Sequence, residues 1–491
     1  MGAELQFRAR RALIAPMWTQ ILVILHYAVA LAVVVRVLLR PRLEPTVRLS
    51  WILVIELVPL VGVLAYVLFG EIRARGADIE NLASVRGRLS GLGQPSPELV
   101  RDPPDFAAPV IAANRATGGF GAVSGNRATL LAEDDSAMDD LVAAIDAAAD
   151  HVHLLFYIWL DDASGRKVAQ AAIRAARRGV RVRAIIDAFG SRAFGRSQSW
   201  REMREAGADC VEALPLGLPI LGWLSRRMDL RNHRKIVVID HVLGFSGSRN
   251  CSDMAFSLKP RFAPWIDVLL RIEGPVVRQM QAVFLQDWMS YAGEDLGEML
   301  RMAPAVLTPG ETAQVVATGP DDGLGSLSDC MTTLVHAARH RLVITTPYYV
   351  PDSALDAAIR TAARRGVEVT MILPARNDSL IVQATSEGFY YGLVSAGVRL
   401  MLFQGGLLHS KIITADGRMA MLGSANMDRR SFELNYEMNM LFLGGPLTDE
   451  LDRRQESYVA RAEPVLLDEI RAWSVWRRLR NNLLALAAPI L

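Results

Sequence analysis

Two long apolar runs near the start of the chain differ from everything that follows. The first extends from Met17 to Leu39 and the second from Trp51 to Phe69, with a short polar turn, Arg40–Pro45, between them. Each run approaches or reaches the roughly 20 residues that a helix needs to cross a bilayer. The pattern predicts a transmembrane helical hairpin in residues 1–75, with spans over 17–39 and 51–69, which returns the chain to its starting side.

Basic residues lie on the outer side of both runs. Arginine occurs before the first run, after the second run and in the turn, at positions Arg8, Arg10, Arg11, Arg73, Arg75, Arg40, Arg42 and Arg48. The bias favours a cytoplasmic location for both ends of the hairpin and for the rest of the chain. Ala28-Val29-Ala30 resembles the cleavage site of a signal peptide, but the apolar run continues past it, which favours an uncleaved span.

Beyond residue 124 the pattern changes to strand, helix, strand, and this order occurs twice. The preceding segment, 76–124, mixes charged patches with prolines and is typical of a connector. The first copy predicts a strand, a helix and a strand over 152–159, 167–178 and 180–187, and the second predicts them over 341–350, 353–365 and 367–374. Ala175–Val180 recurs almost unchanged as Ala362–Val367, with a glycine placed to end each helix. We therefore expect two tandem α/β/α sandwich domains, 125–300 and 301–491.

Each domain carries the same short motif, His-x-Lys-x4-Asp. It consists of His233, Lys235 and Asp240 in the first domain and of His409, Lys411 and Asp416 in the second. Each copy is followed by Gly-Ser-x-Asn, which contributes Ser248, Asn250, Ser424 and Asn426. One such match arises easily by chance, whereas two ordered copies with the same downstream residues indicate a shared function.

The residue types of one copy suit an anionic phosphate group. β-Branched runs follow His233 and His409 and predict buried strands, on which side chains two positions apart point to the same side. The imidazole can then attack or exchange a proton while the nearby ammonium group neutralises charge. Asp240 and Asp416 lie five residues beyond their lysines, where we expect them to fix the turn at the strand end.

Composition narrows the possible functions. Of the 491 residues 51% are hydrophobic, which is high for a wholly soluble protein, and the net charge of +2 does not favour a protein that binds nucleic acid. The scattered Cys210, Cys251 and Cys330 suggest neither a disulfide framework nor a zinc site. Two similar domains with one His-x-Lys each suggest a pseudo-dimer with one shared site at the seam, in which the chemistry needs no metal.

The paired motifs resemble those of the phospholipase D superfamily, and the sequence around them resembles its bacterial cardiolipin synthase branch. The similar segments cover most of the chain and include 50–70, 157–162, 187–191, 346–351, 428–431 and 480–491. The resemblance implies a multi-pass protein of the bacterial inner membrane with cytoplasmic catalytic domains. It also implies transfer of a phosphatidyl group from one phosphatidylglycerol to another, which gives cardiolipin and glycerol through a phosphohistidine and requires no cofactor.

The same resemblance implies roles for individual residues. His233 would be the nucleophile and His409 the general acid and base, while both lysines and the Ser and Asn residues of Gly-Ser-x-Asn would support the phosphate. A histidine in either role needs its far ring nitrogen held by an acceptor. Glu437 resembles the carboxylate that orients His409, and Asp267 is the candidate partner of His233; the alternative for Asp267 is an acid in a surface turn.

Other functions fit the same residues. A hydrolytic phospholipase D would transfer the group to water, and a related transferase would use an acceptor such as phosphatidylethanolamine. A nuclease of the same superfamily is disfavoured by the nearly neutral charge and by the hairpin. Two intact motifs speak against a scaffold without activity.

Two further apolar segments suit a lipid substrate. Leu214–Leu224 precedes the first motif, and Trp473 and Trp476 lie among arginines near the end of the chain. The first segment is typical of a membrane-dipping loop or of a buried loop. The second is typical of an interfacial amphipathic helix or of a plain surface helix.

Overall fold

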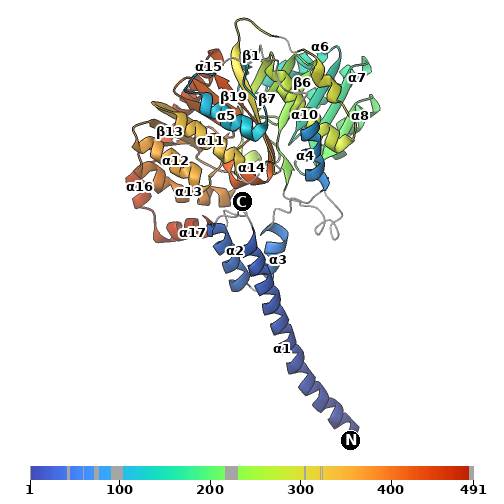
Figure 1. The fold of residues 1–491 in the computed structure, drawn as a ribbon, viewed down its shortest axis with the longest axis vertical. Helices are drawn as coiled ribbons and strands as arrows, with labels where there is room; N and C mark the ends of the chain where they lie inside the picture. Colours follow the sequence, from blue (N-terminus) through green and yellow to red (C-terminus); the bar gives the residue numbers. More distant parts are fainter. Residues whose placement is uncertain are drawn as a thin grey trace. The chain divides into compact units, whose positions relative to one another are not determined.

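The computed structural model describes residues 2–40, 45–58, 60–70, 77–89, 103–215, 230–303, 306–320, 322 and 325–485. The chain forms two compact units, Met1–Arg73 and Ala74–Pro489. The first unit is helical and consists of α1 (Gly2–Leu39), α2 (Pro45–Leu57), α3 (Val61–Ala65) and the π-helical turn η1 (Tyr66–Gly70) (Figure 1).

The helices of the first unit pack along one narrow stripe. Trp51, Ile55 and Tyr66 contact Ala30 and Val37, and all five side chains are buried. Many other apolar side chains of these helices face outward, a distribution opposite to that of a helix in a soluble protein. Among the described residues, Gln20–Leu39 is the one helical segment long and apolar enough to cross a bilayer. The structure therefore agrees with the first predicted span.

The second predicted span, 51–69, is interrupted. α2 ends at Leu57, α3 begins at Val61, and the backbone of Leu60 has a φ of +63°. The sequence has Pro59 at this point, and a proline ring has no amide hydrogen with which to continue a helix. Two short helices and the π-helical turn thus occupy the segment that we expected to be one span.

One mixed sheet forms the centre of the second unit (Figure 1). In its first half the strand order is β1 (Val123–Leu130), β9 (Leu269–Glu273), β7 (Leu243–Gly247), β6 (Lys235–Ile239), β2 (His151–Phe156), β3 (Arg181–Asp187) and β4 (Asp209–Ala213). In its second half the order is β10 (Glu311–Thr318), β19 (Asn435–Leu443), β17 (Met419–Gly423), β16 (Ile412–Ala415), β11 (Arg341–Thr345), β13 (Glu368–Pro374), β14 (Arg399–Phe403) and β20 (Ala462–Pro464). Apart from β20 at the edge, the two orders match strand for strand.

The two halves share a single sheet because β1 pairs with β10 in antiparallel fashion. In each half, the three matching outer strands, β2, β3 and β4 or β11, β13 and β14, run parallel to one another, whereas the edge strand β20 is antiparallel to β14. Parallel strands need crossover connections, which the helices between them supply. The predicted pair of similar domains joined as a pseudo-dimer is confirmed.

Helices cover both faces of the sheet. In the first half one face carries α6 (Ala137–Ala147), α7 (Ala163–Arg177) and α8 (Gln198–Glu205), and the other carries α10 (Val276–Ala292). In the second half the corresponding helices are α11 (Ser326–Ala337), α12 (Ser353–Arg364) and α13 (Leu380–Ser395) on one face and α15 (Pro446–Val459) on the other. On β2, Leu154 and Phe156 join the core on the α7 side and Leu155 joins the core on the α10 side, as the two-residue period of a strand requires.

The repeated sequence Ala-Ala-Arg-Arg-Gly-Val builds the same turn in both halves. Gly179 and Gly366 follow α7 and α12 with φ values of +89° and +92°, a region that favours glycine. The guanidinium groups of Arg178 and Arg365 donate to carbonyl oxygens at the C-terminal ends of α6 and α11. Each arginine thereby satisfies oxygens that a helix end leaves without a partner.

The segment that we expected to be a connector, 76–124, contributes two helices to the body. α4 (Ala77–Leu89) places Val85 and Leu89 in the core beside α10. α5 (Ala108–Gly118) places Val110 and Ile111 in the core beside α11. Each helix buries only a narrow apolar stripe, and this explains why the overall composition of the segment is polar.

A buried guanidinium group links the two halves. Arg234 lies between the histidine and the lysine of the first motif, is fully buried, and its Nη1 donates to Oδ1 of Asp287 on α10 at 2.7 Å. Its Nε and Nη2 donate to the carbonyl oxygens of Glu437 and Thr318 in the second half, at 3.3 and 3.2 Å. Burial of the guanidinium is thus matched by one carboxylate and by carbonyl groups from across the seam.

The second motif has no charge at the equivalent position. Ser410 stands there, and its hydroxyl donates to the carbonyl oxygen of Ile266 at 3.0 Å. The two halves are therefore linked by a charged hydrogen-bond donor at one motif and by a neutral donor at the other.

We expect Asp287→Asn to destabilise the body, because it leaves the Arg234 guanidinium charged and buried without its counter-charge. The expected loss of unfolding free energy is about 3–5 kcal/mol. Thermal unfolding of the detergent-solubilised protein, followed by circular dichroism, measures it.

Asp146→Asn is the matched control, because Asp146 pairs with Arg174 on the surface at 2.7 Å. Its loss should cost no more than about 1 kcal/mol. Equal destabilisation by the two substitutions would show that the buried pair contributes no more than a surface pair.

Candidate active site

Two very short strands bring the motifs of the two halves together. β5 (Arg231–Asn232) pairs in parallel with Asn435 and Tyr436 at the start of β19. β15 (Leu407–Leu408) pairs in parallel with β8 (Trp265–Ile266). The amide of His233 then donates to Tyr436 O at 2.9 Å, and the amide of His409 donates to Ile266 O at 2.8 Å. Each motif histidine is thus attached by its backbone to the opposite half.

The side chain of each motif histidine is also bonded to a carboxylate of the opposite half. Nδ1 of His233 lies 3.0 and 2.9 Å from the two carboxylate oxygens of Glu437, and Nδ1 of His409 lies 2.8 Å from Oδ1 of Asp267. The expected pairing within each half, Asp267 with His233 and Glu437 with His409, is therefore wrong. The reason is that these short strands pair between the two halves. Asp267 follows β8 and His409 follows β15, so the two lie side by side. His233 follows β5, which pairs with the start of β19 next to Glu437. Asp267 is also only 6% exposed, which excludes the surface-turn interpretation.

Ser248 and Ser424 serve the carboxylates. The Ser248 hydroxyl donates to Asp267 Oδ1, and the Ser424 hydroxyl donates to Glu437 Oε2. Each serine oxygen also accepts a backbone amide from the residue after its carboxylate, at 3.0 and 2.9 Å. We expected both serines to support the phosphate, but the structure places their hydroxyls behind the histidines, where they fix the orienting carboxylates.

The lysines lie beside their histidines, as expected. Lys235 and Lys411 are buried, and each Nζ donates to the backbone oxygen of the histidine two residues before it. Burial lowers the pKa of Lys235 to about 8 and that of Lys411 to about 7, although Asp267 and Glu437 oppose this shift. Neither ammonium group forms an ion pair with a carboxylate within the described residues, so both charges are available for an anionic ligand.

The asparagines of Gly-Ser-x-Asn lie at the same site and are buried. Asn250 Oδ1 accepts the amide of Ile158 at 3.3 Å. Asn426 is held by its backbone amide, which donates to the Ser431 hydroxyl at 3.1 Å, while its Oδ1 has no hydrogen-bond partner in the described structure. Asn435 and Asn439 likewise have a buried amide atom without a partner among the described residues, so this feature alone does not identify a ligand.

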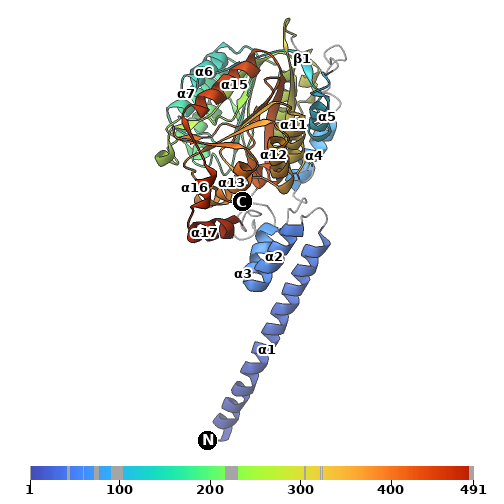
Figure 2. The same ribbon diagram turned by 90° about the vertical axis from the view of Figure 1, so that its left-hand side faces the viewer.

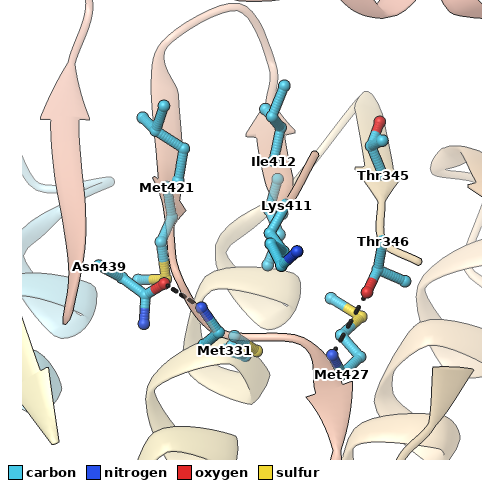
Figure 3. Close-up of a pocket in the computed structure, with 11 residues that line it drawn as sticks. Met331, Thr345, Thr346, Lys411, Ile412, Met421, Met427 and Asn439 are labelled. Atoms are coloured by element: carbon cyan, nitrogen blue, oxygen red, sulfur yellow. Dashed lines mark hydrogen bonds between the residues drawn. The ribbon is translucent and has the colours of Figure 1, made fainter. Parts of the chain in front are cut away.

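Figure 3 shows the interior beside Lys411. Thr346 and Asn439 lie on either side of this lysine, and Thr346 accepts the amide of Met427. The cavity here measures about 10 Å³, which is room for about one water molecule. It is too small for a lipid head group, so the substrate cannot approach Lys411 from this side.

Asp240 and Asp416 lie far from the histidines. Asp240 accepts the amides of residues 149, 150 and 151, each at 2.8 Å, and Asp416 accepts those of residues 339, 340 and 341, at 2.7 to 2.8 Å. Both have a positive φ, +50° and +57°, at the opposite ends of β6 and β16 from the histidines. This agrees with the expected turn role. Each aspartate lies seven positions beyond its histidine, which corresponds to on the order of 20 Å of largely extended chain.

The electrostatics of the site set the protonation states. Burial lowers the pKa of His233 to about 4 and also lowers that of His409, so both rings are neutral near pH 7. Burial alone would raise the pKa of Asp267 and of Glu437, but the imidazoles, lysines and serines outweigh it and lower each to about 2. With ionised carboxylates on Nδ1, each imidazole carries its proton there and presents a lone pair on Nε2.

Aromatic rings flank both histidines and were not expected as site residues. The Tyr157 ring centroid lies 4.7 Å from that of His233, and the Trp265 centroid lies 4.8 Å from that of His409. The only signal in the sequence was position, because Tyr157 lies within the predicted strand 152–159 and Trp265 stands two residues before Asp267. These rings exclude water from one side of each imidazole and limit its rotation.

A group of possible metal ligands lies at the other end of the sheet. Asp150, His151 and His241 are the one such cluster among the described residues. The Asp150 carboxylate is paired with the Arg181 guanidinium, and the ring nitrogens of His151 face Asp150 and Gln281 at 2.9 and 3.3 Å. The cluster adjoins the turn of Asp240, at the start of β2, and is therefore separate from the paired motifs.

Known families and proteins match the chain over nearly all of its length. The family described as "Cardiolipin synthase, PLD-like domain" matches residues 141–288 and 331–458, and "Phospholipase D-nuclease N-terminal" matches residues 28–71. Cardiolipin synthase A of Edwardsiella ictaluri is 36% identical over 477 residues, which cover 95% of this chain and 97% of that protein. Cardiolipin synthase A of Klebsiella pneumoniae is 36% identical over 482 residues, which cover 96% and 98%.

A solved structure supports the fold independently. Phosphatidylserine synthase of Haemophilus influenzae superposes with a TM-score of 0.58 at 13% identity and covers 78% of this chain and 100% of that chain. At this identity the likeness concerns the fold alone. Because one family pattern matches in both halves and close relatives align from end to end, the chain belongs to the cardiolipin synthase family of the phospholipase D superfamily.

Proposed function

We propose that this protein transfers a phosphatidyl group from one phosphatidylglycerol molecule to another, giving cardiolipin and glycerol. The observation that carries the proposal is the pair of neutral imidazoles, each held on Nδ1 by an ionised carboxylate from the other half, beside two buried lysines. The relatives named cardiolipin synthase A, which align over 95% or more of the chain, support the choice of substrate.

In the first step Nε2 of His233 attacks the phosphorus of one phosphatidylglycerol. His409 first takes up a proton on Nε2 from solvent as the anionic phosphodiester binds. A P–N bond then forms as the bond from phosphorus to the glycerol oxygen breaks, and His409 gives that proton to the oxygen. Lys235 and Lys411, with Asn250 and Asn426, stabilise the charge on the remaining phosphate oxygens. The buried site supplies this stabilisation with groups already in place.

In the second step His409 takes a proton from the terminal hydroxyl of the second phosphatidylglycerol. The alkoxide oxygen attacks phosphorus, the P–N bond breaks, and His233 returns to its neutral form. The products are one cardiolipin and one glycerol for two phosphatidylglycerols. Every proton in this scheme moves through side chains of the chain itself, so we propose no cofactor.

We propose that the first unit anchors the protein in the bacterial inner membrane and that the catalytic body is cytoplasmic. Support comes from the apolar Gln20–Leu39 segment, from the helices that pack against it and from the arginines that flank the hairpin in the sequence. A chain that enters and leaves the bilayer on one side would be multi-pass.

Full-length protein in detergent micelles with phosphatidylglycerol should release cardiolipin and glycerol in equal amounts. His233→Ala and His409→Ala should each lower the rate by on the order of 10³-fold or more, because each removes one partner of the double displacement. Lipid chromatography and an enzymatic glycerol assay measure the products.

His336→Ala is the control for this assay, because His336 is exposed and lies outside the site. Phosphatidic acid in place of cardiolipin would identify a hydrolase. A product that appears only with added phosphatidylethanolamine would identify a different acceptor.

Binding of the phosphodiester should weaken as pH rises from 6.5 to 9. A lysine is charged below its pKa, and the values of about 7 for Lys411 and about 8 for Lys235 mean that both ammonium groups lose their protons in this range. We expect the Kd for dihexanoyl phosphatidylglycerol, whose own charge is constant here, to rise about tenfold or more. Calorimetry on the His233→Ala variant, which does not turn over, measures it.

Lys411→Met should remove the part of this pH dependence centred near pH 7, because it removes the group that titrates there. A Kd that is constant across the whole pH range would contradict the assignment of the lysines as the groups that bind phosphate.

Topology is tested with single cysteines in a variant that lacks Cys210, Cys251 and Cys330. Arg42→Cys, in the turn of the hairpin, should react with an impermeant maleimide in spheroplasts. Asp468→Cys, at a side chain that is 92% exposed on the body, should react only after permeabilisation. Labelling of position 468 in intact spheroplasts would place the body outside the cytoplasm.

A further inference from the structure

The last described helix, α17 (Val475–Ala485), exposes its apolar side chains and buries a polar one, whereas an ordinary surface helix buries its apolar side. Val475, Trp476, Leu479 and Leu483 are 72%, 79%, 54% and 63% exposed. They lie within an arc of about 100° on the helix, because successive residues are rotated by about 100°. Asn481, on the opposite side, is the residue of this helix that is buried. We refer to the four exposed apolar side chains as the α17 stripe.

The body holds α17 with the stripe facing away from it. Asn481 Nδ2 and Arg477 Nε both donate to Glu387 Oε2 on α13, at 2.7 and 3.1 Å. The Arg477 guanidinium also lies 3.9 Å from the centre of the Trp473 ring, which fixes the start of the helix. Glu387 is only 6% exposed, so these contacts form a buried polar anchor. Figures 1 and 2 both show α17 beneath α13, at the end of the body opposite α15.

The charge around the α17 stripe favours an anionic surface. The helix carries Arg477, Arg478 and Arg480 and no acidic residue. A tryptophan flanked by arginines is typical of the interface between lipid head groups and acyl chains. The helix has 11 residues, about 16 Å, which is far too short to span a bilayer but long enough to lie in its surface.

A cavity beside the helix adds room for a polar group. It measures about 420 Å³ between α13 and α17, and its lining includes Arg471, Arg478 and Asn482 together with Trp473. Glu387 also lines it, but its carboxylate is already bonded to Arg477 and Asn481. Cationic and amide groups next to an outward apolar stripe match the two parts of a phospholipid, an anionic head group and apolar chains. A second copy of this chain fits less well, because a symmetric contact would bring the same arginines together.

We propose that α17 docks the catalytic body on the surface of an anionic phospholipid bilayer. The α17 stripe enters the boundary of the acyl chains, and the arginines lie at the level of the phosphates. The identity of the lipid as phosphatidylglycerol rests on the proposed function, whereas the docking itself does not. Docking keeps the active site at the surface where its lipid substrate is concentrated.

The first test measures insertion in the full-length protein, reconstituted in phosphatidylcholine vesicles with and without an equal amount of phosphatidylglycerol. Leu479→Cys, in a variant without the native cysteines, carries an environment-sensitive fluorophore, and lipids with a nitroxide on the acyl chain quench it. We expect strong quenching that increases with phosphatidylglycerol.

Glu456→Cys on α15 is the matched control, because its side chain is 61% exposed at the opposite end of the body. It should remain unquenched. Equal quenching at both positions, or none at position 479, would overturn the proposal. An apolar fluorescence signal at position 479 that does not depend on lipid and disappears when the protein is diluted would also overturn it. That result would indicate a contact between two copies of the protein.

The second test measures function with the double variant Trp476→Ser and Leu479→Ser. In vesicles its KM for lipid should rise about tenfold, since two large apolar side chains no longer enter the bilayer. With dissolved dihexanoyl phosphatidylglycerol its kcat should equal that of the unchanged protein. Met302→Ser removes another exposed apolar side chain, 55% exposed and not on α17, and should change neither value.

A fall of kcat with the dissolved substrate would instead indicate a folding defect and overturn the docking role. If the unchanged protein makes no cardiolipin, the proposed function fails while the quenching test still decides whether α17 docks. The two proposals can therefore fail separately.

Discussion

The hydrogen bond from each motif histidine to a carboxylate of the opposite half is the contact on which the site depends. If the halves separated, His233 would lose Glu437 and His409 would lose Asp267, together with the backbone contacts of β5 and β15. Neither half alone can hold an imidazole with its proton on Nδ1 and its lone pair directed at a substrate. The pairing of β1 with β10 therefore matters for the active site, because it joins the two halves and so helps to hold each histidine beside its carboxylate.

The two buried lysines offset at most the charge of the two carboxylates before substrate arrives. Asp267 and Glu437 are ionised, both imidazoles are neutral, and Lys411, with a pKa of about 7, is only partly charged at neutral pH. A phosphodiester adds one negative charge, which a site of low dielectric accepts more readily together with a proton. An imidazole next to the phosphate is the group able to take that proton. In the mechanism that we propose, the anionic substrate thus promotes formation of the acid that its cleavage requires, and His409 can be neutral in the empty enzyme.

Local sequence patterns predicted most of the fold and the membership of the site, but not the partnerships within it. Period-two strands, the repeated helix ends and the turn role of Asp240 and Asp416 follow from neighbouring residues, so they are visible in a linear chain. The exchange of Asp267 and Glu437 depends on β5 and β15, which have two residues each and leave no apolar pattern. The hydroxyl partners of the serines and the packing of α4 and α5 are likewise decided by tertiary contacts. The interruption of the second apolar run does have a local signal, Pro59. A proline predicts that the helix breaks near this point but not how the two parts are arranged.

The difference between Arg234 and Ser410 has a consequence for how such a site can arise. In a dimer of identical subunits both motifs would carry the same residue here, so a buried charge would be present at both positions or at neither. A single chain with two linked copies is free of that constraint, and one copy can keep the ionic contact to Asp287 while the other uses a hydroxyl. The surroundings of the two histidines therefore differ, with a buried guanidinium next to His233 and a hydroxyl next to His409.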